Sequence, residues 1–499
     1  MNQSSFQIVL GSALMASAAN GLWFAPVNGL MQIVGMYLLY SVLSAPHKKG
    51  KIFHSWLFTS LWLIGSVWWL YIALHDFGGL NNIITLIALF LLCGGLAIYY
   101  MGALSVMIYA QKQIPKIGRP LVFAACWTFA ELARAQWWTG FPWAAIGYSH
   151  VDTTLSLTAP YIGVYGIGFV SLLLSAYAYE YLKEKKLGTF VVLGMCLSLP
   201  MLLKNKEVSQ TEITVNLLQG NIKQDEKFNV AKQDALEWYL SEIKNNKADI
   251  AVLPETAIPF IKEDMPSEFW DQLKLMTQSK AVIIGIPTRD KDKGYGNSAI
   301  GLGFKQELQY DKYHLVPFGE FTPDILRWFT RMMSLDFGDF NRGSIDQSAF
   351  QWRDQKLAIT ICYEDLFGED LAVRFNDVEN APSLFVNISN IGWFGDTSVV
   401  NQHIDIARMR SMEFKRPTIR ATNSGGTAII SSDGVVQAQL KPYTRGQLTG
   451  KLPTSSKEIT VFAYWAGKWG LMPLWILTGV IMLATLLNKR FRHKSESVK

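Results

Sequence analysis

Long apolar stretches at both ends of the 499-residue chain constrain its fold more than any other feature. Residues 1–203 consist largely of such stretches, residues 204–465 have the composition of an ordinary globular domain, and residues 470–487 are apolar again. A helix of ~20 apolar residues crosses a hydrocarbon core of ~30 Å. Eight stretches approach this length, at 6–24, 26–45, 54–75, 83–110, 119–137, 158–182, 187–203 and 469–487. We therefore predict an α-helical membrane domain of about eight spans beside a water-exposed domain.

Lysine and arginine side chains gather in four segments that follow every second apolar stretch. These segments lie at 48–51, 112–119, 183–186 and 489–499. Loops rich in Lys and Arg stay in the cytoplasm, so the pattern predicts that both termini are cytoplasmic and that the water-exposed domain lies outside the cytoplasmic membrane. The same segments carry the excess positive charge of a chain whose formal net charge is +6, so its charge is no indication of nucleic-acid binding.

The distribution of apolar residues divides the chain into three parts. We expect a membrane domain of about seven helices at 1–204, an extracytoplasmic domain at 205–465, and a transmembrane helix with a basic cytoplasmic tail at 466–499. The alternative for the first stretch is a cleaved signal peptide. The start MNQSSFQ lacks the positive residues of a signal peptide, which disfavours this alternative.

Strand and helix patterns alternate in the extracytoplasmic domain. Apolar runs with β-branched residues predict strands at 213–218, 250–253, 281–286, 297–302, 357–362, 383–388 and 427–430. Helical patterns occupy 229–245 and 399–416, with shorter ones near 266–278 and 366–375. Alternation of this kind is typical of an α/β domain with a buried sheet.

Cys362 lies at the end of one predicted strand, with polar residues directly after it. The other cysteines (Cys93, Cys126 and Cys196) fall in apolar stretches, so Cys362 has no predicted disulfide partner and is either buried or reactive. Glu255 and Lys312 follow two other strand-like runs. A thiol, a carboxylate as general base and an ammonium beside a developing oxyanion make a site for acyl transfer through a thioester. The sequence contains no CxxC and no His pair at zinc-ligand spacing, so we expect neither a metal nor a cofactor.

Ordered sequence blocks over nearly the whole chain carry a resemblance to a known family. The blocks are TGFPWAAIGYS (139–149), QGNIKQ (219–224), PET (254–256), DKYHLVPFGEF (311–321), ICYED (361–365), NISNIGWFGDT (387–397), QHIDIARMRSMEFKRP (402–417) and RATNSGGTA (420–428). The extracytoplasmic domain resembles the nitrilase, or carbon–nitrogen hydrolase, superfamily, which implies an αββα sandwich. With its apolar stretches, the chain resembles the apolipoprotein N-acyltransferase family of Gram-negative bacteria.

The resemblance implies roles for individual residues. It makes Glu255, Lys312 and Cys362 a catalytic triad, with three supporting residues nearby: Glu320, Tyr363 and Glu364. The family often has Trp a few residues after the QGN block, where this chain has Phe228. The aromatic ring is kept there, and the indole N–H is lost.

The resemblance also implies a reaction and its partners. An sn-1 acyl chain would pass from a phospholipid, commonly phosphatidylethanolamine, to Cys362 and then to the α-amine of the diacylglyceryl-cysteine of an apolipoprotein. We expect a multi-pass protein of the inner membrane with a periplasmic catalytic domain, acting as a monomer.

Aromatic and Met-rich segments are candidates for holding lipid or covering the site. Segment 323–340 includes Trp328, Phe329 and Met332, and is either core packing or a mobile lid at the membrane interface. Trp393 and Phe394 are candidate contacts for acyl chains. The loop containing Trp143 is either an interfacial aromatic belt or a surface that binds lipid.

Two other functions fit parts of the sequence. A membrane-tethered nitrilase-type amidase would share the triad without needing access to lipid. A transporter with an inactive external domain is disfavoured, because the apolar stretches hold few ionisable residues besides Glu131 and Arg134.

Overall fold

A computed structural model describes residues 2–46, 49–185, 188, 191, 194, 212–290, 294–303, 306–324, 327, 339–454 and 458–496. The chain forms two compact units. The first consists of residues 1–205 and 469–499, and the second of residues 206–468.

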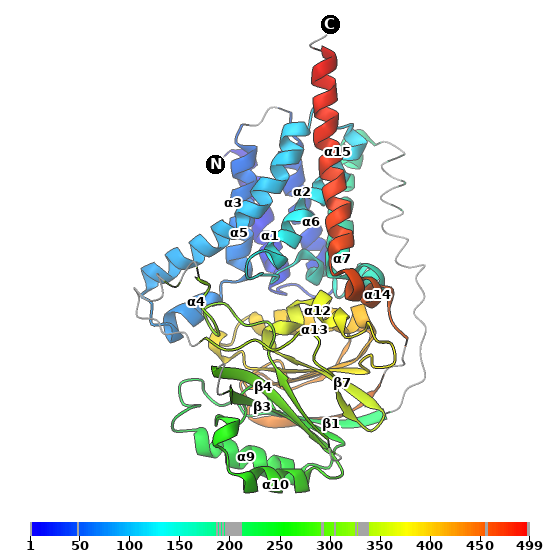
Figure 1. Ribbon diagram of the computed structural model, residues 1–499. Helices are drawn as coiled ribbons and strands as arrows, with labels where there is room; N and C mark the ends of the chain where they lie inside the picture. Colours follow the sequence, from blue (N-terminus) through cyan, green and yellow to red (C-terminus); the bar gives the residue numbers. More distant parts are fainter. Residues whose placement is uncertain are drawn as a thin grey trace. The chain divides into compact units, whose positions relative to one another are not determined.

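The first unit is a bundle of helices (Figure 1). Its main helices are α1 (Gln3–Ala19), α2 (Val27–Ser44), α3 (Lys51–Ser66), α5 (Asn82–Ala110), α6 (Arg119–Gln136), α7 (Ala159–Glu184) and α15 (Met472–Glu496), with short α4 (Leu70–Ile72) after α3. Apolar side chains of α5, such as Leu86 and Phe90, stay exposed, as expected for a helix that faces lipid.

Three helical segments of the described residues are long and apolar enough to cross a membrane: Val27–Ser44, Asn82–Ala110 and Thr154–Glu184. The number rises to five if two bent helix pairs, Lys51–Ser66 with Leu70–Phe77 and Val461–Trp469 with Met472–Leu487, each count as one span. The predicted count of about eight is therefore not confirmed. The predicted span at 187–203 lies almost wholly outside the described residues.

The second unit contains two six-stranded sheets. The first has the order β12-β1-β2-β3-β4-β5, and its strands are β1 (Glu212–Gln219), β2 (Ile250–Val252), β3 (Ala281–Asp290), β4 (Gly294–Gly303), β5 (Gln306–Asp311) and β12 (Gly446–Pro453). The second has the order β11-β10-β9-β8-β7-β6, and its strands are β6 (Phe350–Trp352), β7 (Gln355–Ile361), β8 (Leu384–Ser389), β9 (Thr418–Thr422), β10 (Ala428–Ile430) and β11 (Val436–Gln439). In each sheet three neighbouring strands are parallel, β1-β2-β3 and β7-β8-β9.

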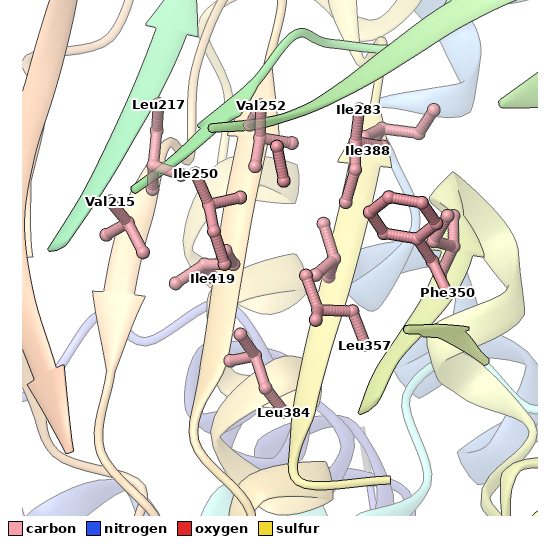
Figure 2. Packing of buried hydrophobic residues seen from close by; sticks show 14 of the residues in the cluster. Val215, Leu217, Ile250, Val252, Ile283, Phe350, Leu357, Leu384, Ile388 and Ile419 are labelled. Atoms are coloured by element: carbon pink, nitrogen blue, oxygen red, sulfur yellow. The ribbon is translucent and has the colours of Figure 1, made fainter. Parts of the chain in front are cut away.

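An apolar layer fills the space between the sheets (Figure 2). Val215, Leu217 and Val252 of the first sheet meet Ile388 and Ile419 of the second in one buried cluster. Alternate side chains of a strand point to opposite faces, so each buried strand also presents apolar residues to its outer face.

Helices cover both outer faces (Figure 1). On the first sheet lie α9 (Lys232–Asn245) and α10 (Ser267–Met276), packed through Tyr239 and Leu273. On the second lie α12 (Gly368–Val373), α13 (Val399–Phe414) and α14 (Val461–Trp469), with Leu371, Phe414 and Phe462 in the apolar contact. The result is an α–β–β–α sandwich, which confirms the predicted α/β class for this unit.

The predicted strands all occur, with ends shifted by a few residues, and so do the four predicted helices. Strands β6, β9, β11 and β12 were not predicted, and β5 was predicted only as the strand-like run before Lys312. The predicted lid, 323–340, is described only at residues 323, 324, 327, 339 and 340.

Candidate active site

Cys362 begins a short 3-10 helix, Cys362–Leu366, directly after β7. Its backbone has a φ of 53°, in the left-handed region, which costs a residue other than glycine on the order of 1–3 kcal/mol. Two side chains hold this turn through the Cys362 carbonyl oxygen: Asn387 Nδ2 donates to it at 3.4 Å, and His403 Nε2 lies 3.2 Å away. Burial lowers the pKa of His403 well below its usual value, so the neutral ring donates its Nε2 proton. The position of the thiol is thus set by a strained turn that Asn387 and His403 stabilise.

Glu255 lies in the loop after β2, on the other sheet. Its carboxylate accepts three hydrogen bonds. Oε1 accepts from Asn297 Nδ2 at 2.6 Å and from Lys312 Nζ at 3.4 Å, and Oε2 accepts from the backbone N–H of Asn390 at 2.8 Å. These donors fix the position and orientation of the carboxylate.

Lys312 follows β5 and is 1% exposed. Its ammonium donates to Glu320 Oε1 at 2.8 Å as well as to Glu255. Burial alone would lower the pKa of Lys312, but the charges of Glu255 and Glu320 outweigh this effect and raise it. Lys312 therefore stays charged through the neutral range, as a group that stabilises an oxyanion must.

The thiol of Cys362 experiences all of these charges. Burial, and then the charge of Glu255, raise the pKa of Cys362 to about 12, against the opposing effects of Lys312 and the backbone N–H of Asn390. A cysteine with this pKa carries its proton at neutral pH. A nucleophilic attack by this sulfur would therefore need a base to remove that proton.

Glu364 links the nucleophile turn to the segment that follows Lys312. Its Oε1 accepts from the backbone N–H of Tyr313 at 2.7 Å, and its Oε2 accepts from the N–H of Ile361 at 2.7 Å. The hydroxyl of Tyr310 donates to both oxygens. Burial chiefly raises the pKa of Glu364, although these donors oppose that effect. The carboxylate thus ties the two sheets together at the site.

The other supporting residues lie in the same place. Glu320 is buried, and it accepts from Asn297 Nδ2 at 2.7 Å and, through Oε2, from the Val316 N–H at 2.8 Å. Tyr363 is buried, with its ring centroid 5.3 Å from that of Phe367. Asp365, next in the turn, forms a buried ion pair with Arg420 at 2.7 Å.

The predicted lipid-contact residues have different positions. The rings of Phe228 and Trp393 are exposed on the second unit, and Phe394 is half-buried. Trp143 belongs to the first unit, where it is buried against Trp69 at a centroid distance of 4.9 Å. Trp328, Phe329 and Met332 lie outside the described residues. Among the described side chains no group of His, Cys, Asp and Glu has the arrangement of a metal site.

Sequence reasoning did not single out Asn297, Asn390 or His403. Asn390 and His403 lie inside two of the sequence blocks noted above, yet only the fold shows that one donates to Glu255 and the other lies beside the Cys362 carbonyl. Asn297 lies on β4, in a strand of ordinary composition, and its side chain bridges the two carboxylates.

Comparison with known proteins gives consistent matches over the chain. The family model described as the apolipoprotein N-acyltransferase N-terminal domain matches residues 16–177, and the carbon-nitrogen hydrolase model matches residues 214–458. An apolipoprotein N-acyltransferase of Verminephrobacter eiseniae is 38% identical, over 94% of this chain and 93% of that protein. The relative from Ralstonia nicotianae with the same name is 36% identical, over 87% of this chain and 84% of its own length.

Proposed function

This chain belongs to the apolipoprotein N-acyltransferase family, and we propose that it performs the N-acylation of lipoproteins through a thioester on Cys362. It is a membrane-bound N-acyltransferase with a nitrilase-like catalytic unit. Similarity over nearly the whole chain favours this function over a membrane-tethered amidase.

The proposal rests above all on the charges around the thiol. Cys362 is a protonated, half-buried thiol under the influence of the Glu255 carboxylate and the Lys312 ammonium, both of which are buried and hydrogen-bonded. This is the arrangement that base-assisted attack of sulfur on an ester requires.

In the first half of the proposed ping-pong reaction, Glu255 takes the proton of Cys362 as the sulfur attacks the sn-1 ester carbonyl of a phospholipid. Lys312, with backbone N–H groups near Cys362, stabilises the tetrahedral oxyanion. The C–O bond breaks, the leaving alkoxide takes the proton from Glu255, and a lysophospholipid departs. In the second half the free α-amine of a diacylglyceryl-cysteine attacks the thioester. Its proton passes to Glu255, the C–S bond breaks, and the thiolate recovers the proton.

The supporting residues have positioning roles in this scheme. Glu320 holds Lys312 and, through Asn297, Glu255. Glu364 fixes the turn that carries the nucleophile. Tyr363 is proposed to support the nucleophile next to it. Candidate residues are proposed to contact acyl chains (Phe228, Trp393, Phe394 and Trp143) or to belong to a lid (Trp328, Phe329 and Met332).

The cellular setting is part of the proposal. The donor is phosphatidylethanolamine, the acceptor is a diacylglyceryl apolipoprotein, and the enzyme acts as a monomer in the inner membrane. Residues 205–465 would be periplasmic, with both termini cytoplasmic, on the Lys and Arg distribution of the apolar regions (1–204 and 466–499).

The test is mass spectrometry of the purified protein after incubation with phosphatidylethanolamine in detergent. We expect an acyl adduct on Cys362 that disappears when diacylglyceryl lipopeptide is added, with the chain transferred to the peptide amine. Cys362→Ala is the matched control and should give no adduct. An adduct on this variant, or release of free fatty acid from wild type without transfer, would contradict the proposal.

A further inference from the structure

A second lysine is buried beside Glu255, in the segment between β1 and α9. Lys227 is 1% exposed, whereas Phe228 and Val230 in the same segment are 51% and 87% exposed. Residues 227–230 therefore present two apolar side chains to the surface and a charged one to the interior. This is the reverse of what folding alone favours.

Lys227 contacts the loop that carries the catalytic carboxylate. Its Nζ donates a hydrogen bond of 3.1 Å to the backbone carbonyl oxygen of Glu255, and the Glu255 charge acts on it. Burial lowers the pKa of Lys227 to about 8, although Glu255 acts in the opposite direction. The charged form thus pays a large desolvation cost, which simple packing would avoid with an apolar side chain.

The loop that carries Glu255 also packs against strand β3. At Gly285 of β3 a Cβ atom would lie 2.3 Å from the Pro254 carbonyl oxygen, so the loop rests directly on the strand. Thr256, the next residue after Glu255, has a φ of 51°. Lys227 and β3 thus both contact the backbone that leads into a strained residue.

The charges around the thiol balance only if Lys227 is counted. Glu255 and Glu320 supply two buried carboxylates, and Lys312 one ammonium that contacts both. The neighbouring buried charges are matched separately, because Asp365 pairs with Arg420 and Glu364 interacts with Arg374. Lys227 is a further buried ammonium, and its charge interacts with that of Glu255.

We propose that Lys227 is a positioning residue that anchors the Glu255 loop and places a second positive charge beside the Glu255 carboxylate, so that Glu255 is held ready to accept the Cys362 proton. The inference rests on the proposed role of Glu255 as base. It assigns to Lys227 a role in keeping the base active at low pH, in addition to its contact with the loop.

The test uses Lys227→Gln, which keeps a donor for the Glu255 carbonyl and removes the charge. Acylation of Cys362 by p-nitrophenyl butyrate is followed as the butyryl adduct by intact-protein mass spectrometry, in detergent, across the pH range. We expect the rise of the rate with pH to move upward by about one unit, so that the variant is about tenfold slower at low pH and approaches wild type at higher pH.

Two further variants make the test specific. Lys227→Arg keeps the charge and should keep the wild-type profile. If Lys227→Gln does not fold, Lys227→Met replaces it as the uncharged variant, with the same displaced profile expected. Lys223→Met is the matched control, because Lys223 lies in the same segment with its side chain 73% exposed beside Glu226. This control should behave as wild type throughout.

The proposal would be overturned if the acylation rate of Lys227→Gln fell by the same factor at every pH. It would also be overturned if the pH profile of Lys227→Arg moved upward as expected for Lys227→Gln. The small ester needs no phospholipid. A displaced pH profile for Lys227→Gln, together with no acyl adduct from phosphatidylethanolamine, would contradict the assignment of the donor but support the role of Lys227. An acyl adduct from phosphatidylethanolamine, together with an undisplaced profile, would support the donor and contradict the role of Lys227.

Discussion

Each unit of the molecule buries a group of charged side chains, and the two groups use their charges differently. In the first unit Arg134 of α6 donates to the hydroxyl of Tyr100 at 2.9 Å and to the carbonyl oxygens of Phe141 and Trp143 at 2.5 Å. Glu131, one turn earlier, accepts from the N–H of Ile146 at 2.9 Å. The charges there are directed at the backbone of the loop after α6.

In the second unit the charged groups are directed at one another and at a thiol. Lys312 contacts two carboxylates, and these share Asn297. The comparison shows that burial of charge alone does not indicate chemistry. Charges that satisfy backbone groups hold a loop in place, whereas charges that converge on a nucleophile can change its protonation.

The largest effect that separates the two groups is expected for Glu255→Gln. The amide cannot accept the thiol proton, so acylation of Cys362 should slow by about 10²–10⁴-fold, the usual contribution of a general base. Rapid-quench mass spectrometry with phosphatidylethanolamine measures this rate. A variant that acylates as fast as wild type would show that the proton leaves by another route.

Arg134→Met tests the first unit. It removes the hydrogen bonds that Arg134 donates to two carbonyl oxygens and the positive charge beside Glu131, which should reduce stability by about 3–5 kcal/mol. Thermal unfolding in detergent measures the loss, and the folded fraction should still acylate Cys362 with p-nitrophenyl butyrate at the wild-type rate. The double variant Glu131→Gln/Arg134→Met should regain part of the loss. If the single variant is as stable as wild type, the charges in this unit do not hold the loop.

The smallest effect concerns the thiol itself. Because the pKa of Cys362 is raised to about 12, its thiolate fraction should grow about tenfold per pH unit without levelling between about pH 8 and 10. Alkylation by iodoacetamide should follow that rise, whereas an ordinary cysteine approaches a plateau in this range. If the alkylation rate instead reached a plateau near neutral pH, Cys362 would be a thiolate in the resting protein, paired with Lys312. Its pKa would then be lowered, as in activated cysteines.

The strands that the sequence predicts correctly are the buried ones. β7 and β8 are rich in buried apolar and β-branched residues, and Cys362 stands out directly after the first because polar residues follow it. β11 and β12 were missed because they are edge strands in which exposed and half-buried residues alternate, so their composition is that of a loop. The predicted number of spans is not confirmed for a related reason: α1 has only 17 residues, and α6 includes buried charged residues.

The sequence predicts those residues of the candidate site whose side chains are themselves reactive, but not the residues whose position depends on the fold. Cys362, Glu255 and Lys312 carry reactive groups at strand ends, and their roles remain proposals that the experiments above address. In the sequence Lys227 resembles a solvent-exposed lysine, because it lies in a polar segment and its neighbours form no pattern that indicates burial. Its position depends on the loop after β2, which lies 28 residues further along the chain.

The carboxylate of Glu364 joins the end of β7 to the backbone of Tyr313, which follows β5 in the opposite sheet. The separation of the two sheets thus governs how far the sulfur lies from the ammonium that would stabilise the oxyanion. Residues that never touch a substrate, such as Phe350 packed over Gly301 between the sheets, therefore influence turnover through their volume. Enlarging or shrinking that interior by a methyl group is a way to tune the rate of this enzyme without altering any group that reacts.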